Sequence, residues 1–269
     1  MMIRAELLRL SWRQVADSIE KQLANFLKES SCERYVVGLS GGLDSSTAAT
    51  LAVSAVGKSR VIGLFLPDRQ VTPSVDIRDA EKVAKTLGIR TYSIDLTTIL
   101  SSFSQATPFF QSDSKIANGN LRARTRMSLL YYYANLENAL VLGTGDRSEI
   151  LIGYFTKYGD GATDILPLGD LYKTQVRELA RFLKVPNSIV EKPSSPRLWI
   201  GHTAKEELGL DYELIDLILH GYFDLKLSKP KVARELAVSV SDVQQILERS
   251  KLSGHKRNLP PIIIVRNLS

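Results

Sequence analysis

Residues 35–51 of the chain read YVVGLSGGLDSSTAATL. The apolar run at the start of this stretch is typical of a buried strand, the glycines end it, and the Ala-rich residues from Ser45 onward are typical of a helix. In a unit of strand, glycine turn and helix, backbone N–H groups and the positive end of the helix form a cradle for anionic oxygens. The stretch therefore predicts a phosphate-binding loop.

Asp44 distinguishes this loop from the familiar GxxxxGK[ST] loop, in which a lysine neutralises the terminal phosphates. The matching position here holds a carboxylate, which would repel phosphate unless a cation lay between them. Asp44 therefore predicts Mg²⁺. The alternative is that Asp44 only caps its helix, because Asp is a favoured N-cap residue. A cap, however, would need neither the preceding Ser-Gly-Gly nor the following Ser45 and Ser46.

Composition indicates an ordinary globular protein. The chain has 269 residues, of which 44% are hydrophobic and 24% charged, enough to bury a large core in one α/β domain. No apolar run approaches the roughly 18 residues of a membrane span, and the N-terminus lacks a signal-peptide core. The single cysteine, Cys32, excludes an intramolecular disulfide framework and favours a reducing cytoplasm. The net charge of +6 would suit nucleic acid or a small polyanion equally well.

Strand and helix patterns alternate along the first part of the chain. Beyond the first unit, the expected elements are strands at 60–67, 90–96 and 139–146 and helices at 74–87 and about 121–138. This alternation predicts a parallel sheet wound on both faces, with ligands at the carboxyl ends of the strands. The segments 38–44 and 143–149 both lie at such ends, so we expect them to form one site.

We interpret residues 1–269 as a single domain in four parts. Residues 1–30 are expected to form an amphipathic N-terminal helix, 31–184 a nucleotide-binding α/β core, 185–209 a mobile cover loop, and 210–269 a mostly helical part. The apolar stripe of the first helix consists of Leu8, Trp12, Val15, Ile19, Leu23 and Phe26.

Polar residues that packing does not explain gather in further segments. NLRARTRM, 120–127, places Arg124 nearly opposite Arg122 and Arg126 on a helix, although a solvated basic face has the same pattern. GTGDRSE, 143–149, offers Thr144 to a nucleotide and Glu149 as a second ligand of Mg²⁺, which takes only one or two protein carboxylates. The stretch 153–176 mixes lysines, aspartates, glycines and tyrosines, which suits a ligand with anionic and hydroxyl groups.

At these residues the chain resembles the NAD synthetase family, within a wider group of ATP pyrophosphatases that share the SGG-x-DS loop. The resemblance covers most of the chain. In order, it is carried by SGGLDSS, NLRARTRM, GT-x-x-x-SE, TKYGDGATD, the LYKTQV helix, the PS-x-x-LW segment and the final HKR. It implies a doubly wound parallel sheet of the adenine nucleotide alpha-hydrolase-like type with a C-terminal helical extension.

The resemblance also implies a two-step, amide-forming ligation, the last step of NAD biosynthesis, in a cytoplasmic, Mg²⁺-dependent homodimer. The nicotinate carboxylate of deamido-NAD would attack the α-phosphorus of ATP, releasing pyrophosphate and leaving an acyl-adenylate. Ammonia would then displace AMP to give NAD. No covalent enzyme intermediate is implied, so we expect no catalytic nucleophile.

Binding residues follow from the same resemblance. ATP would be bound by Gly38, Leu39, Ser40, Gly41, Gly42, Leu43, Asp44, Ser45, Thr144, Lys173 and Ser195. Deamido-NAD would be bound by Arg124, Lys157, Asp164, His255 and Lys256. Asp44 and Glu149 would hold Mg²⁺.

Ammonia is the expected nitrogen source, because family members that use glutamine carry an extra amidase domain with a nucleophilic cysteine. This chain has neither the length for it nor a suitable Cys. Two positions depart from the family pattern: residues 201–205 read GHTAK where GQTDE is usual, and Asp146 stands where asparagine is more common.

Two other hypotheses remain open. Another SGG-type enzyme, such as a GMP synthetase catalytic unit, would share the loop but leave TKYGDGATD unexplained, and a thiolating enzyme would need more cysteines. Residues 231–257 have the helix, turn, helix and basic end of a DNA-binding motif, a pattern shared by helical hairpins that pack on a domain. We expect association with neither a membrane nor nucleic acid.

Overall fold

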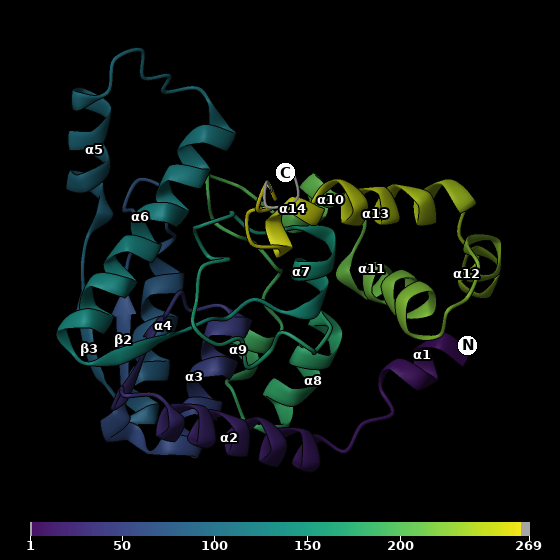
Figure 1. Cartoon of the computed structure of the whole chain (residues 1–269), viewed down its shortest axis with the longest axis horizontal. Coiled ribbons are helices and arrows are strands. Elements are labelled where there is room, and N and C mark those ends of the chain that lie inside the picture. The colour runs from purple at the N-terminus through teal and green to yellow at the C-terminus, as the bar shows by residue number, and fades with distance from the viewer. Residues whose placement is uncertain (1, 265–269) are drawn as a thin grey trace.

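The computed structural model describes residues 2–264 and has an α/β architecture (Figure 1). Within these residues, four parallel strands form a sheet in the order β3-β2-β1-β4. The strands are β1 (Arg34–Gly38), β2 (Val61–Phe65), β3 (Arg90–Ser93) and β4 (Ala139–Leu142).

Most of the longer helices cover the sheet, and the others, apart from α1, follow its last strand in the chain. The covering helices are α2 (Trp12–Glu29), α3 (Leu43–Val56), α4 (Ser74–Leu87), α5 (Leu96–Ala106), α6 (Lys115–Leu136) and α8 (Lys173–Phe182), with the 3-10 turn η1 (Lys58–Arg60) after α3. The others are α1 (Met2–Leu7), α7 (Arg147–Ile152), α9 (Asn187–Val190), α10 (Ala204–Leu208), α11 (Tyr212–Leu219), α12 (Lys229–Leu236), α13 (Val240–Leu252) and α14 (Gly254–Arg257), with the π-helical turn η2 (His220–Asp224) after α11.

The sheet is buried on both faces. Successive side chains of a strand point to opposite faces, so Tyr35 and Val37 of β1 pack under α2, α3, α4 and α8, whereas Val36 packs under α5 and α6. Every residue of β2 is buried, as expected for a strand with helices on both sides. The predicted doubly wound parallel sheet is confirmed.

The strand order fixes where a ligand can bind. From β1 the chain adds β2 and then β3 on one side, and β4 on the other side of β1. The direction of winding therefore reverses between β1 and β4, whose residues Val37 and Leu142 are paired. In open α/β sheets the crevice at such a reversal, beyond the carboxyl ends of the strands, is where ligands bind.

A second apolar cluster lies outside the sheet, where α1 packs with α7 and the helices from α10 to α13. Figure 1 shows these C-terminal helices on the side of the molecule away from α5. Helix α1 contacts α11 and η2. The expected C-terminal helical extension is therefore present, and it includes the N-terminal turns of the chain.

The N-terminal helix expected over residues 1–30 is two helices, separated by residues 8–11. Leu8 lies in this break and is 40% exposed, and Phe26 is 37% exposed. Leu23 is buried as predicted, and Leu27 is buried in place of Phe26, because a residue four positions after Leu23 returns to the same helix face. The predicted stripe was therefore wrong at both of its ends.

Other elements begin or end at different residues from those predicted. The stretch expected as a strand at 90–96 ends at Ser93, because the Asp95 side chain accepts a hydrogen bond from the backbone N–H of Thr97 and begins α5. Helix α6 begins at Lys115, about two turns before the predicted start. Within 185–209, short helices α9 and α10 flank an irregular segment.

Candidate active site

The glycine loop lies at the carboxyl end of β1, at the reversal point of the sheet. Gly41 has a φ of +72°, and a Cβ atom there would lie 2.0 Å from the carbonyl oxygen of Asp76, so only glycine fits. Ser45 Oγ lies 3.3 Å from the backbone nitrogen of Ser40 and accepts its hydrogen bond, and the hydroxyls of the two serines are 3.0 Å apart. These contacts fold the loop around the N-terminus of α3.

Asp44 does not cap α3. The N-cap residue is Gly42, and no side chain makes a capping hydrogen bond there. The capping alternative is therefore wrong. Asp44 Oδ2 lies 2.9 Å from the Lys173 ammonium, and Oδ1 is buried without a hydrogen-bond partner. A buried carboxylate oxygen without a partner is costly in a protein and fits a site that receives a cation.

Lys173 lies at the centre of an acidic cluster. Its ammonium is 2.9 Å from Asp44, 2.7 Å from Asp146 and 2.9 Å from Glu149, and its side chain is 1% exposed. The three carboxylates come from α3, from the turn after β4 and from the first turn of α7, and the lysine is the first residue of α8. The predicted pair Asp44 and Glu149 is therefore brought together, around a cation that the chain itself supplies.

Local hydrogen bonds hold these residues in place. Asp146 caps α7, because its side chain accepts from the backbone N–H of Glu149 at 2.8 Å, and Glu149 in turn accepts from the N–H of Asp146 at 3.3 Å. Ser148 Oγ accepts from the backbone N–H of Lys173 at 2.9 Å and donates to buried Asp216. The β4–α7 turn and the start of α8 are thus tied to α11.

Burial raises the pKa of Asp146 to about 7, with Lys173 opposing the shift and Asp44 adding to it. Burial and the carboxylate of Asp146 raise the pKa of Glu149 well above its usual value. Burial lowers the pKa of Lys173, but Asp146, Asp44 and Glu149 together outweigh it and raise that pKa. The lysine is therefore protonated at neutral pH.

The raised pKa of Asp146 can be tested through the pH dependence of the unfolding free energy. The folded-state pKa of Asp146, about 7, exceeds the ordinary value of 3.8, so between those values the folded state binds more protons than the unfolded state. Stability from this group is complete at low pH and is lost as the pH rises to about 7. In metal-free buffer we expect the unfolding free energy of Asp146→Asn to change less steeply with pH over this range, by at most about 1.4 kcal/mol per pH unit. If the unfolding free energies of the parent and of Asp146→Asn, measured by urea titration, changed equally with pH, the raised pKa of Asp146 would be contradicted.

The carboxylates of Asp44 and Glu149 match what Mg²⁺ requires of a protein. Within residues 2–264, no three His, Cys, Asp or Glu side chains are arranged as a complete metal site. Magnesium, however, needs only one or two protein carboxylates and takes its other ligands from phosphate and water. Two carboxylates fit that requirement. Asp44 Oδ1 has no hydrogen-bond partner, and Asp44 and Glu149 each lie 2.9 Å from the Lys173 ammonium.

A second group of predicted residues meets between α6 and α14. Arg124 donates to the carbonyl oxygen of Lys157 from two nitrogens, each at 3.3 Å, and Lys157 Nζ donates to the carbonyl oxygen of His255 at 2.7 Å. Lys256 Nζ donates to the carbonyls of Gly153 and Phe155, each at 2.8 Å, and burial lowers its pKa. Four of the five residues assigned to deamido-NAD therefore lie together in one group, called the cationic group below, in which Arg124, Lys157 and Lys256 are the cations and His255 contributes its backbone carbonyl.

Three other predicted residues, Asp164, Thr144 and Ser195, make no hydrogen bond to a member of either group within residues 2–264. Asp164 accepts from the Tyr131 hydroxyl at 3.1 Å and from the backbone N–H of Val141 at 2.6 Å, beside β4. Thr144 is half-buried just after β4, and the Ser195 hydroxyl donates to the carbonyl of His202. Their contacts with substrates stay predictions.

A model of the NAD synthase family matches residues 15–260. The chain belongs to this family. It is 52% identical over 250 residues to the NH(3)-dependent NAD(+) synthetase of Staphylothermus marinus, covering 91% of this chain and 90% of that protein. It is 51% identical over 256 residues to that of Hyperthermus butylicus, covering 95% and 92%. It is also similar to the structure of NMN synthetase from Francisella tularensis, with a TM-score of 0.84 and 35% identity over 94% of this chain and 99% of that one.

Membership of the NAD synthase family confirms the resemblance and supersedes the GMP synthetase hypothesis. The helices expected of a DNA-binding motif, α12 and α13, use Val232, Val243 and Ile246 to pack in the C-terminal cluster. They are a packed helical hairpin of this family member. No helix among residues 2–264 is long and apolar enough to cross a membrane.

The three arginines of α6 point in two directions, as their spacing predicted: Arg122 and Arg126 to one side and Arg124 to the other. Arg122 pairs with buried Asp68 at 2.6 Å, and Arg126 Nε donates to the Leu66 carbonyl at 3.0 Å, both next to the end of β2. Arg124 points instead toward Lys157. Arg122 and Arg126 are therefore not a solvated basic face, the alternative that spacing alone left open.

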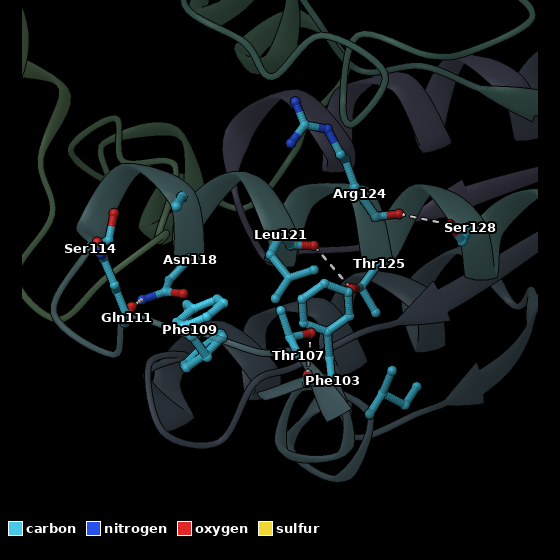
Figure 2. Close-up of a pocket in the computed structure, with 13 residues that line it drawn as sticks. Phe103, Thr107, Phe109, Gln111, Ser114, Asn118, Leu121, Arg124, Thr125 and Ser128 are labelled. Atoms are coloured by element: carbon cyan, nitrogen blue, oxygen red, sulfur yellow. Dashed lines mark hydrogen bonds between the residues drawn. The ribbon is translucent and has the colours of Figure 1, made fainter. Parts of the chain in front are cut away.

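A mostly apolar cavity lies between α5 and the first half of α6. Its volume is about 730 Å³, and of the described residues that line it only Arg124 belongs to the predicted binding set. Figure 2 shows the Arg124 guanidinium pointing away from the Phe103 and Phe109 rings. The residues of the glycine loop and of the carboxylate cluster do not line this cavity.

Proposed function

We propose that this chain uses ATP to join ammonia to the nicotinate carboxylate of deamido-NAD, giving NAD, AMP and pyrophosphate. The observation that carries the proposal is that the glycine loop, Asp44 and Glu149 meet at the reversal point of the sheet. They do so in a chain 52% identical to a protein named NH(3)-dependent NAD(+) synthetase.

The ATP phosphates belong at the glycine loop. Backbone N–H groups of the loop and the N-terminus of α3 favour anionic oxygens there. Asp44 and Glu149 would hold Mg²⁺, which would neutralise phosphate charge as the nicotinate carboxylate approaches the α-phosphorus. Lys173 holds the carboxylates of Asp44 and Glu149 in register, and its positive charge would favour the negative charge that develops on pyrophosphate.

Deamido-NAD belongs at the cationic group of Arg124, Lys157, His255 and Lys256. Backbone carbonyls already orient Arg124, Lys157 and Lys256, so their positive charges are fixed before an anionic dinucleotide arrives. Holding two anionic substrates in line supplies much of the rate without a covalent enzyme intermediate. No residue is assigned as a nucleophile.

We also propose, from family resemblance, a homodimer in the cytoplasm. Free ammonia as the nitrogen source is supported by the names of the relatives that match 90% or more of their own length. Light scattering coupled to gel filtration measures the mass in solution, and a monomer at micromolar concentration would contradict the dimer.

The proposed function is tested by comparing three candidate substrates for amidation. The protein is incubated with ATP, Mg²⁺ and ammonium together with deamido-NAD, nicotinate mononucleotide or xanthylate, and both AMP and the amide are measured. We expect AMP and amide only with deamido-NAD. The structural similarity to an NMN synthetase makes nicotinate mononucleotide the second candidate substrate. If the mononucleotide were amidated faster than deamido-NAD, the proposed substrate would be the mononucleotide and not the dinucleotide.

A further inference from the structure

Lys192 links the segment 185–209, called the cover segment below, to the glycine loop. Its Nζ donates to the carbonyl oxygen of Gly41 at 2.9 Å, to Asp76 Oδ1 at 2.9 Å and to Asp79 Oδ2 at 2.6 Å. An ammonium has three N–H donors, so these three acceptors satisfy it completely. The side chain is 15% exposed, so the contact is largely shielded from water.

The Gly41 carbonyl shares a peptide unit with the N–H of Gly42. In a trans peptide these two groups point in opposite directions, and the described residues contain no cis peptide. The Gly42 N–H points to the Ser40 hydroxyl, at 3.3 Å, within the loop. Lys192 therefore holds the carbonyl outward and keeps the N–H directed into the loop, toward the Ser40 hydroxyl.

This peptide needs an anchor, because glycines flank it on both sides. Glycine adopts positive and negative φ with similar ease, so the Gly41–Gly42 peptide can rotate at low cost. A rotated peptide would direct a carbonyl oxygen toward the bound phosphates and would remove an N–H donor from them. The contact with Lys192 opposes that rotation.

The anchor depends on the cover segment being docked. Arg197 Nε donates to Asp76 Oδ2 at 2.9 Å, so two cations of the segment share one carboxylate that is 5% exposed. On the far side, Arg122 donates to the Leu198 carbonyl at 3.2 Å. Lys192 can reach Gly41 only while these contacts hold the segment against α4 and α6.

We propose that Lys192 is a positioning residue for the phosphate-binding loop. It fixes the Gly41–Gly42 peptide without touching the nucleotide, and so couples phosphate affinity to the docking of the cover segment. The inference rests on the proposed function, because it takes the loop to be the ATP phosphate site. The sequence offered no signal for it, since Lys192 lies 151 positions from Gly41.

The test compares Lys192→Met with Lys192→Arg and with Lys205→Met, a control in the same segment whose lysine only pairs with exposed Asp211. Affinities for α,β-methylene ATP with Mg²⁺ and for adenosine are measured by calorimetry. We expect Lys192→Met to weaken analogue binding about tenfold, Lys192→Arg to recover part of the loss, and Lys205→Met to match the parent. Adenosine affinity should be unchanged in all three.

The outcomes separate the two proposals. A parent protein that fails to bind the analogue contradicts the proposed function. A parent that binds it, with Lys192→Met binding equally well, overturns the role of Lys192 alone. An equal loss of adenosine affinity in Lys192→Met would show only structural damage and would also overturn it. If that variant does not fold, Asp79→Ala, which removes one of the three acceptors, should raise the KM for ATP and leave the KM for deamido-NAD unchanged.

Discussion

Asp44→Asn is expected to lower the rate of AMP formation about 100- to 1,000-fold, the usual cost of removing one charge-stabilising group from an active site. Asparagine keeps the shape of the side chain but loses the negative charge that a divalent cation requires. Lys173 would retain Asp146 and Glu149 as partners, so the fold should persist. AMP release from ATP with deamido-NAD and ammonium measures the effect, and circular dichroism verifies the fold.

Two controls accompany this variant. Asp17→Asn makes the same chemical change at an exposed position of α2, and Cys32→Ser removes the single thiol, which lies outside both groups of predicted residues. Both should keep nearly full activity. Full activity of a folded Asp44→Asn protein would contradict the metal assignment, and a folded but inactive Cys32→Ser would contradict the absence of a nucleophile.

The position of the site could be predicted because local patterns determined it. The sequence pattern places a glycine turn at the end of β1 and a polar turn at the end of β4. Parallel strands bring their carboxyl ends to one edge of the sheet, so the two turns are expected to lie together. The pairing of Asp44 with Glu149 followed from the chemistry of magnesium. Both arguments need only the residue types and the order of the elements.

Other members of the site could not be predicted, because their roles depend on contacts between distant segments. Asp146 was noted only as a departure from the family pattern, yet it is fully buried and contacts Lys173. The Asp-x-x-Glu spacing of a capping box, Asp146 to Glu149, was the one signal that could have placed it. Asp76 and Asp79 read as ordinary residues of α4, and only the folded chain brings Lys192 to them.

Lys173→Met is expected to destabilise the fold by about 3–5 kcal/mol, because removing one partner of a buried ion pair leaves the other charge uncompensated. Here one ammonium is replaced by an apolar side chain of similar length, and the carboxylates of Asp44, Asp146 and Glu149 are left facing one another. The unfolding free energy from urea titration at pH 7 measures the loss. Lys251→Met, at an exposed position of α13, is the matched control and should remain within about 0.5 kcal/mol of the parent.

Two further measurements separate charge from packing in this variant. If uncompensated charge causes the loss, Asp146→Asn in the Lys173→Met background should restore part of it, since one of the three carboxylates is then neutral. Lowering the pH from 8 to 5 should also stabilise Lys173→Met more than the parent, because the carboxylates left without the lysine take up protons more readily in the folded state. A deficit that neither the second substitution nor low pH reduces would mean that Lys173 acts through its packed hydrocarbon chain and not through its charge.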